Sequence, residues 1–182
     1  MVGKGRHSIL GARSVDPVLS FIAPIGLAAS VGTGLVVDLV SAPTPGSRNL
    51  RDIAADGPAL AELSPGRQGV ALLTGGDISK SEAVDTLERL AARWPAVTVR
   101  VSGQSWPFPV VPVIPLYPGR LVSEAEAVGV WQPIGAHGTP RGPGPVLPRL
   151  RPGALRRLLA GQLPRRSRWV AAWRPVWEMP WA

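Results

Sequence analysis

Apolar runs alternate with amphipathic segments along the first hundred residues of the chain. Four runs carry few charges and are rich in branched aliphatic residues, as expected for strands covered on both faces. These runs are HSILGA (7–12), LVVDLV (35–40), GVALLTGG (69–76) and AVTVRV (96–101). Helices are predicted between them, at 16–30, in two short pieces at 49–57 and 58–66, and at 77–94. This alternation predicts a small three-layer α/β domain with a mostly parallel sheet, flanking helices and right-handed crossovers.

The uncharged segment 17–37 has the length of a membrane span. Ser14 or Asp16 is placed to cap a helix that has a proline in its first turn. The sequence SVGTG (30–34) interrupts this helix where a spanning helix would continue, and a β-branched strand pattern follows. We therefore favour a buried helix, turn and strand, with a single membrane span over 17–37 as the alternative.

Proline is frequent in a later segment, PFPVVPVIPLYPG (107–119). A proline nitrogen has no hydrogen to donate to a neighbouring strand, so prolines occur at sheet edges or in extended polyproline-like segments. We therefore expect an edge strand or an extended segment here rather than a central strand.

Charge separates the chain into two parts. Residues 1–140 contain eleven Lys or Arg and eleven Asp or Glu, whereas residues 141–182 contain nine Arg and only Glu178, which accounts for the whole net charge of +8. The absence of cysteine excludes disulfides, thiolate catalysis and cysteine metal sites, and it fits a cytoplasmic protein. We divide the chain into an α/β domain at 6–120 and an extended basic arm, rich in Pro, Arg and Trp, at 121–182.

Residues 8–102 resemble the ParA/MinD-type P-loop ATPases in the order of their elements. Asp38 matches the aspartate at the end of the second strand of that family, and TGG (74–76) matches a small-residue turn after a later strand. EAVDTLERLAARWPAVTVRV (82–101) matches the helix and strand that follow the turn. The resemblance implies a P-loop-like α/β fold and a protein that works by dimerising and by contacting membranes or DNA.

The nucleotide-binding residues of that family are missing from this chain. Where the family has a glycine-rich loop with a lysine, this sequence has GARSVDP (11–17), and its Gly-Lys pair at 3–4 precedes the first strand. Val40 and Arg100 stand at two positions where acidic residues are expected. Because phosphoryl transfer depends on these groups, we predict a pseudo-ATPase without a cofactor, in which Asp38 marks a vestigial site or is a polar strand end.

No other catalytic or metal-binding pattern is visible in the sequence. His7 and His137 have no acidic residue or second histidine at metal-ligand spacing, and Ser30 and Ser105 lack the context of a hydrolase nucleophile. We therefore predict no catalytic residues, no metal site and no enzyme activity.

The arm contains the remaining candidate functional residues. Residues 151–169 predict a short basic amphipathic helix, which could pack its leucines on the domain, lie on an anionic membrane or bind phosphate backbones. Four tryptophans end the chain at every fourth position, and Pro175 prevents one continuous helix. We expect the first two tryptophans to share a face that contacts the domain, and the last two to point elsewhere and close a surface. The candidate interaction residues are Arg156, Arg157, Arg165, Arg166, Arg168, Trp169, Trp173, Trp177 and Trp181.

Together these patterns predict a non-catalytic scaffold or adaptor, in the cytoplasm or peripherally on an anionic membrane surface. Its expected partner is a protein, either an active ATPase or a secretion or septum-placement apparatus, as the resemblance implies. The alternative is a nucleic-acid-binding protein that uses the arginines of the arm.

Overall fold

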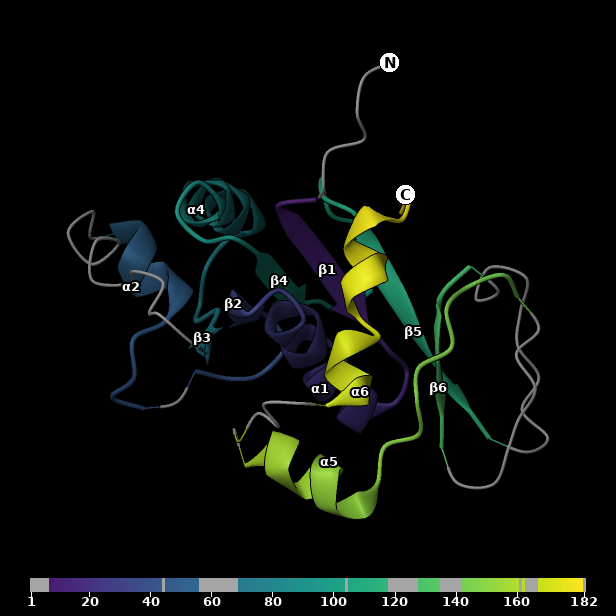
Figure 1. Ribbon diagram of the computed structural model, residues 1–182. Helices are drawn as coiled ribbons and strands as arrows, with labels where there is room; N and C mark the ends of the chain where they lie inside the picture. Colours follow the sequence, from purple (N-terminus) through teal and green to yellow (C-terminus); the bar gives the residue numbers. More distant parts are fainter. Residues whose placement is uncertain are drawn as a thin grey trace.

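Six parallel strands form one sheet in the computed structural model, which describes residues 7–43, 45–55, 69–103, 105–117, 128–134, 142–160, 162 and 167–181 (Figure 1). The strands are β1 (Ile9–Arg13), β2 (Thr33–Asp38), β3 (Gly69–Thr74), β4 (Val97–Arg100), β5 (Val110–Leu116) and β6 (Val130–Pro133), in the order β3-β2-β4-β1-β5-β6. The helices are α1 (Pro17–Ala29), α2 (Leu50–Ala55), α4 (Lys80–Ala91), α5 (Pro152–Leu159), α6 (Arg168–Ala171) and the 3-10 helix η2 (Arg174–Glu178). The predicted parallel α/β fold is confirmed, whereas the short helix expected at 58–66 lies outside the described residues.

Helix α1 begins where the sequence predicts, at the Asp16 cap. The Asp16 carboxylate accepts a hydrogen bond from the Leu19 backbone nitrogen at 2.9 Å, and Pro17 needs no such acceptor. The helix ends at Ala29, and Gly32 turns the chain into β2 with a φ of 89°, in the left-handed region. With 13 residues, α1 is about 20 Å long, shorter than the apolar core of a bilayer. No helix within the described part of the chain is long and apolar enough to cross a membrane.

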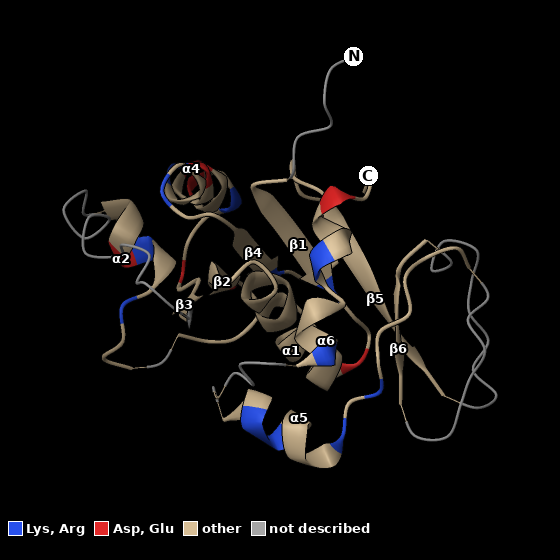
Figure 2. Ribbon diagram, viewed as in Figure 1, with Lys and Arg blue, Asp and Glu red and all other residues tan. Residues whose placement is uncertain are grey.

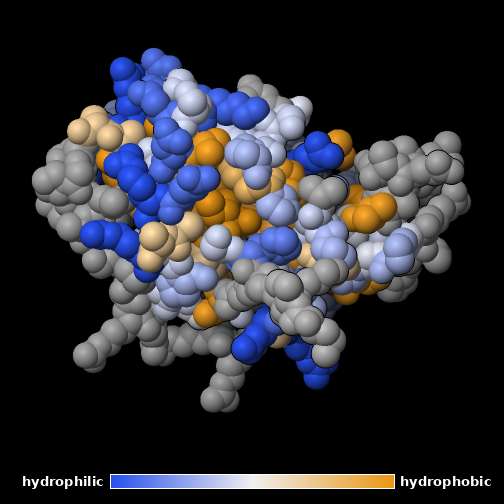
Figure 3. All heavy atoms as spheres, turned by 90° about the horizontal axis from the view of Figure 1, so that it is seen from above, coloured by the Kyte–Doolittle hydropathy of each residue, from blue (hydrophilic) through white to orange (hydrophobic). Residues whose placement is uncertain are grey.

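Helices cover both faces of the sheet. Helices α2 and α4 pack on one face, over β2, β3 and β4 (Figure 1). A view from above shows the hydrophilic side chains gathered on the α4 side of the molecule, with hydrophobic atoms beside them (Figure 3). Helix α1 lies on the opposite face, centred on β4, β2 and β1, so β5 and β6 need another cover on that face.

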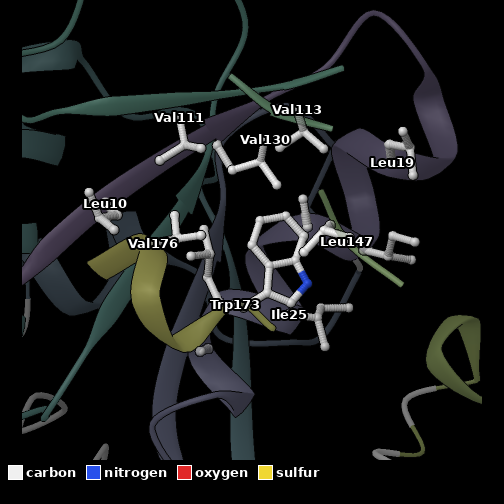
Figure 4. Packing of buried hydrophobic residues seen from close by; sticks show 14 of the residues in the cluster. Leu10, Leu19, Ile25, Val111, Val113, Val130, Leu147, Trp173 and Val176 are labelled. Atoms are coloured by element: carbon white, nitrogen blue, oxygen red, sulfur yellow. The ribbon is translucent and has the colours of Figure 1, made fainter. Parts of the chain in front are cut away.

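The C-terminal segment supplies this cover. Helix α6 and η2 lie beside α1, and the ring of Trp173 lies among side chains of three strands (Figure 4). These neighbours include Leu10 of β1, Val113 of β5 and Val130 of β6, all in the same buried cluster as α1. Trp173 itself is 0% exposed, so it is part of the core rather than a surface residue.

Two further indoles are buried beside Trp173. Trp169 Nε1 donates to Oε1 of the buried Gln132 in β6 at 2.6 Å, and Trp177 Nε1 donates to the backbone oxygen of Leu27 in α1 at 3.0 Å. The rings of Trp169 and Trp173 meet edge to face, with 5.5 Å between their centroids. Burial of an indole stabilises a fold by a few kcal/mol, so these three side chains bind the C-terminal segment firmly to the sheet.

The α-helical spacing predicted that Trp177 points away from the domain, and this prediction is wrong, because the Trp177 side chain is buried. Pro175 does divide the segment as predicted, since the chain continues beyond α6 as the 3-10 helix η2. Side chains advance by about 120° per residue in a 3-10 helix and about 100° in an α-helix, so extrapolating α-helical spacing across Pro175 misplaces Trp177. Trp181 stays partly exposed, and its Nε1 donates to the backbone oxygen of Val176 at 2.6 Å.

Strand β6 and the C-terminal helices lie beyond residue 120, where the sequence suggested the end of the α/β domain. Strand β6 nevertheless pairs with β5, and α5, α6 and η2 all contact α1. The described residues on the two sides of that boundary therefore share one sheet and one core.

Strand β5 is not an edge strand, and this corrects the expectation drawn from its prolines. It lies between β1 and β6, and its first half pairs with β1 while its second half pairs with β6. Odd-numbered residues of β5 face β1, since Pro109 O accepts from Gly11 N, and even-numbered residues face β6, since Leu116 O accepts from Ile134 N.

This alternation explains why β5 tolerates its prolines. The nitrogen of Pro112 faces β6, but the paired region of β6 starts only opposite Val113. The nitrogen of Pro115 faces β1, but the pairing with β1 ends at Pro112. Neither proline therefore removes a hydrogen bond from the ladders, which is the usual reason for excluding proline from a central strand.

Gly26 of α1 tests the docking of the C-terminal segment. A Cβ atom at Gly26 would lie 2.4 Å from Trp173 Nε1 and 2.7 Å from Trp169, so Gly26→Ala forces the two indoles away from the helix. We expect the free energy of unfolding to fall by about 1–3 kcal/mol, as for other overpacked cores. Urea unfolding followed by far-UV circular dichroism measures this change.

Gly153→Ala is the matched control, because it makes the same change in α5, where nothing lies within 4 Å of the added atom. Alanine favours a helix over glycine, so this variant should be neutral or slightly more stable. Equal stability of the Gly26→Ala variant and the wild type would contradict the tight packing of both tryptophans on α1.

Candidate functional site

The connections that leave β1 and β4 run to opposite faces of the sheet. The chain leaves β1 for α1 on one face, and it leaves β4 through residues 101–109, whose Trp106 and Phe108 pack in the cluster of α4. The two strands are neighbours in the sheet. Open α/β sheets bind ligands outside the carboxyl ends of strands where adjacent connections diverge in this way. The carboxyl edge near β1 and β4 is therefore the candidate site.

A cleft of about 550 Å³ lies at this point. The ends of β1, β2 and β4, the middle of β5 and the start of α1 line it. Its lining residues are Arg13, Ser14, Val15, Pro17, Ser20, Val40, Arg100, Val101, Ser102, Gly103, Pro112, Val113 and Ile114. Most of these side chains are apolar or small, and two are arginines. The size and the mixture of apolar walls with few polar groups are those of small-molecule pockets.

Arg100 and Asp38 form a buried ion pair beside this cleft. Arg100 Nη1 lies 3.0 Å from Asp38 Oδ2, and the exposed fractions of the two side chains are 12% and 4%. The guanidinium also donates to the Ser20 hydroxyl at 3.0 Å and to the Ser41 hydroxyl at 2.8 Å. The remaining carboxylate oxygen, Asp38 Oδ1, accepts from the backbone nitrogens of Val40 and Ser41 at 2.9 Å each.

These contacts keep the Asp38 carboxylate ionised. Burial opposes ionisation, but the hydrogen bonds from the Ser41 side chain, the backbone of Ser41 and Val40, and Arg100 outweigh it. The pKa of Asp38 therefore lies below its ordinary value of 3.8. Because both charges are satisfied within the chain, Asp38 has little capacity left to coordinate a metal ion.

The start of α1 is likewise occupied by a group of the chain. The Asp16 carboxylate caps the helix, and Pro17 lacks the backbone hydrogen that a phosphate oxygen would accept. Helix N-termini bind phosphate through free backbone N–H groups and the positive end of the helix dipole. The Asp16 carboxylate already accepts one of these backbone N–H groups, and its charge repels a further anion.

The sequence identified Asp38 and Arg100 separately but missed that they pair. Their partnership follows from register, since Asp38 of β2 lies directly opposite Arg100 of β4 in the parallel ladder. A negative charge near the end of one predicted strand and a positive charge near the end of another could have suggested this ion pair. Strand order and register are needed to convert that signal into a contact.

The candidate residues of the arm separate into buried and exposed groups. Trp169, Trp173 and Trp177 are at most 3% exposed, so their rings contact this chain and not a partner. The exposed arginines of α5, α6, η2 and the residues leading to α5 lie on one side of the molecule (Figure 2). They are Arg149, Arg151, Arg156, Arg157, Arg168 and Arg174. Arg165 and Arg166 lie outside the described residues.

No group of three acidic, histidine or cysteine side chains that could hold a metal ion occurs among the described residues. His7 is used structurally, since its Nε2 lies 2.9 Å from the backbone oxygen of Met179 and joins the two ends of the chain. His137 lies outside the part of the chain that the structure describes.

Comparison with protein-family models, with curated proteins and with solved structures found no match to this chain. The resemblance to ParA/MinD-type ATPases therefore stays a prediction from sequence. What the structure defines is a parallel α/β protein with a cleft at the carboxyl edge of its sheet.

Replacing Asp38 by asparagine tests the ion pair. We expect the free energy of unfolding at pH 7 to fall by about 1–3 kcal/mol, because the partly buried guanidinium of Arg100 loses its carboxylate. A lowered folded-state pKa gives stability that is present above the unfolded pKa and is lost as the pH falls through the folded value. The difference between wild type and Asp38→Asn should therefore shrink below the ordinary pKa of 3.8.

Urea unfolding at pH 7, 5 and 3 measures this dependence. Asp77→Asn is the control, since its carboxylate pairs with Arg51 in an exposed ion pair and should contribute little. A loss of stability in Asp38→Asn that is the same at pH 7 and pH 3 would contradict a role for the Asp38 charge.

Proposed function

We propose that this protein is a non-catalytic scaffold or adaptor that acts through protein–protein contacts. The observation that carries the proposal is the closed charge network at the carboxyl edge. Arg100 neutralises Asp38 at 3.0 Å, and Asp16 caps α1, so each of these groups is already bound within the chain at the usual place of a catalytic site. Phosphoryl transfer needs carboxylates that are free to bind a metal ion there, and the Asp38 and Asp16 carboxylates are already engaged with groups of this chain.

Apolar side chains around the same edge support a contact surface. Val15, Val18 and Val40 are 71%, 40% and 43% exposed, although valine is usually buried. Val15 and Val40 line the cleft, and Val18 lies in the first turn of α1. Exposed apolar groups rimmed by polar residues are typical of protein interfaces. The sequence resemblance extends this proposal to a cytoplasmic partner, either an active ATPase or a secretion or septum-placement apparatus.

Titration with ATP and Mg²⁺ tests the non-catalytic part of the proposal. We expect no saturable heat of binding up to about 1 mM nucleotide by isothermal calorimetry. Weak binding that disappears in the variant Arg156→Gln/Arg157→Gln belongs to the basic arm and leaves the proposal intact. Saturable binding in the micromolar range that survives this substitution would overturn it.

Nucleic-acid binding is the second candidate, and the grouping of arginines on the C-terminal side favours it. Six of the described arginines after residue 141 are exposed, and Glu178 is the only acidic residue in that part of the sequence. None of the six forms an ion pair with another described residue. Such a surface attracts phosphate backbones without reading their sequence.

Salt dependence tests this second candidate. Binding to a fluorescent DNA duplex should weaken at least about tenfold between 50 and 200 mM salt, because the arginines release counterions from the phosphates. Arg156→Gln/Arg157→Gln should weaken binding further than the control Arg48→Gln/Arg51→Gln, which removes the same charge near α2. Equal effects of the two variants, or binding that is insensitive to salt, would argue against the arm as the interface.

A further inference from the structure

One of the two arginines that line the cleft at the carboxyl edge has no side-chain partner among the described residues. Arg13 is the last residue of β1, where it lies opposite Pro112 of β5, and its exposed side chain makes no hydrogen bond or ion pair with any described residue. Arg100 is instead held in place through its Nε and Nη1 atoms by Ser20, Asp38 and Ser41. Its Nη2 atom donates to none of the described residues, and the side chain lines the cleft.

The net charge of the cleft is that of a single cation. The pair of Arg100 with Asp38 is neutral as a unit, so Arg13 supplies the excess positive charge. Asp16, which caps α1, is the nearest described acidic side chain in sequence to Arg13 and disfavours a ligand with several negative charges. A monoanion fits this balance, whereas a nucleotide polyphosphate does not.

The walls of the cleft favour an aliphatic ligand. Val15, Val40 and Ile114 line it together with Val101 and Val113, and no aromatic side chain is among the described lining residues. A base or sugar ring would find neither a stacking partner nor many hydrogen-bond donors here. A branched aliphatic chain would remove the exposed surface of Val15 and Val40 from water, which is favourable.

We propose that this cleft binds a monocarboxylate with a short branched aliphatic chain. The carboxylate accepts hydrogen bonds from Arg13 and from Nη2 of Arg100, since guanidinium groups suit carboxylate oxygens. The aliphatic chain lies against Val15, Val40 and Ile114. Two sources share this chemistry: a free small carboxylic acid, and the C-terminal carboxylate of a peptide that ends in an aliphatic residue. The site goes beyond the adaptor proposal and does not depend on it.

An NMR titration with matched probes tests the proposal. The probes are 4-methylpentanoate, the peptide acetyl-Gly-Gly-Leu with a free carboxyl group, and the amide form of each. We expect saturable shifts of the backbone amide signals of Ser14, Ser102 and Val113, with a Kd of about 0.1–10 mM for such small ligands. The amide forms should bind at least about tenfold more weakly, because they lack the charge that Arg13 recognises. Saturation by the acid alone or by the peptide as well identifies the source.

Two variants keep the outcome independent of folding. Arg13→Gln removes the free cation from an exposed position and should weaken binding of both carboxylates at least about tenfold, while Arg51→Gln on α2 should not. Val15→Asp places a negative charge at the mouth of the cleft and should also weaken binding. Unchanged circular dichroism spectra confirm that each variant is folded.

The proposal is overturned if no probe saturates up to about 20 mM, if the amide forms bind as well as the acids, or if Arg13→Gln binds like the wild type. The nucleotide titration addresses the adaptor proposal separately. If the carboxylate probes do not bind, the adaptor proposal is unaffected. If ATP binds, the adaptor proposal fails, but the carboxylate site gains no support.

Discussion

The structure depends on the burial of three tryptophans from the C-terminal segment against α1 and the sheet. Helix α1 lies mainly over β4, β2 and β1 and covers β5 only in part, and Trp169, Trp173 and Trp177 fill the remaining space on that face. Gly26 allows the close approach, because any side chain there would occupy the position of two indole rings. Large aromatic side chains bury more apolar surface than any others, so a short segment can complete the core in this way.

This packing also shapes the candidate site. Strand β5 carries Val113 and Ile114 to the cleft, and the opposite end of the same strand is held between Trp173 on one face and Phe108 on the other. Phe108 in turn packs over Gly11 of β1, where a Cβ atom would meet its ring at 3.1 Å. The cleft is thus formed in part by a strand that Trp173 and Phe108 cover from opposite faces, although neither of these side chains lines it.

The sequence predicted the helices and strands better than the order and register in which the strands pair. Apolar runs and the Asp16 cap gave the first four strands, α1 and the region of α4, because these signals are local. The position of β5 was missed because the effect of a proline depends on which neighbour its nitrogen faces. The pairing of Asp38 with Arg100 was missed for a similar reason, since register is a property of two distant segments.

The tryptophan pattern shows the same limit. Spacing by four residues and Pro175 correctly predicted a divided segment, but the direction of Trp177 depends on the 3-10 geometry of η2. The exposed arginines and the open cleft are surface features. The amino-acid composition of residues 141–182 indicated the arginines. The cleft could not be predicted, because it is formed where residues of four strands meet and the order of those strands was unknown.

Removal of the C-terminal segment tests the central claim most directly. Urea unfolding of a chain that ends at residue 167, followed by circular dichroism and by binding of a dye for exposed apolar surface, compares it with the full chain. We predict that the shortened chain loses its cooperative transition and binds the dye in the absence of urea, because the apolar face over β5 and β6 is uncovered. A shortened chain that unfolds cooperatively at the same urea concentration as the full chain would contradict the account.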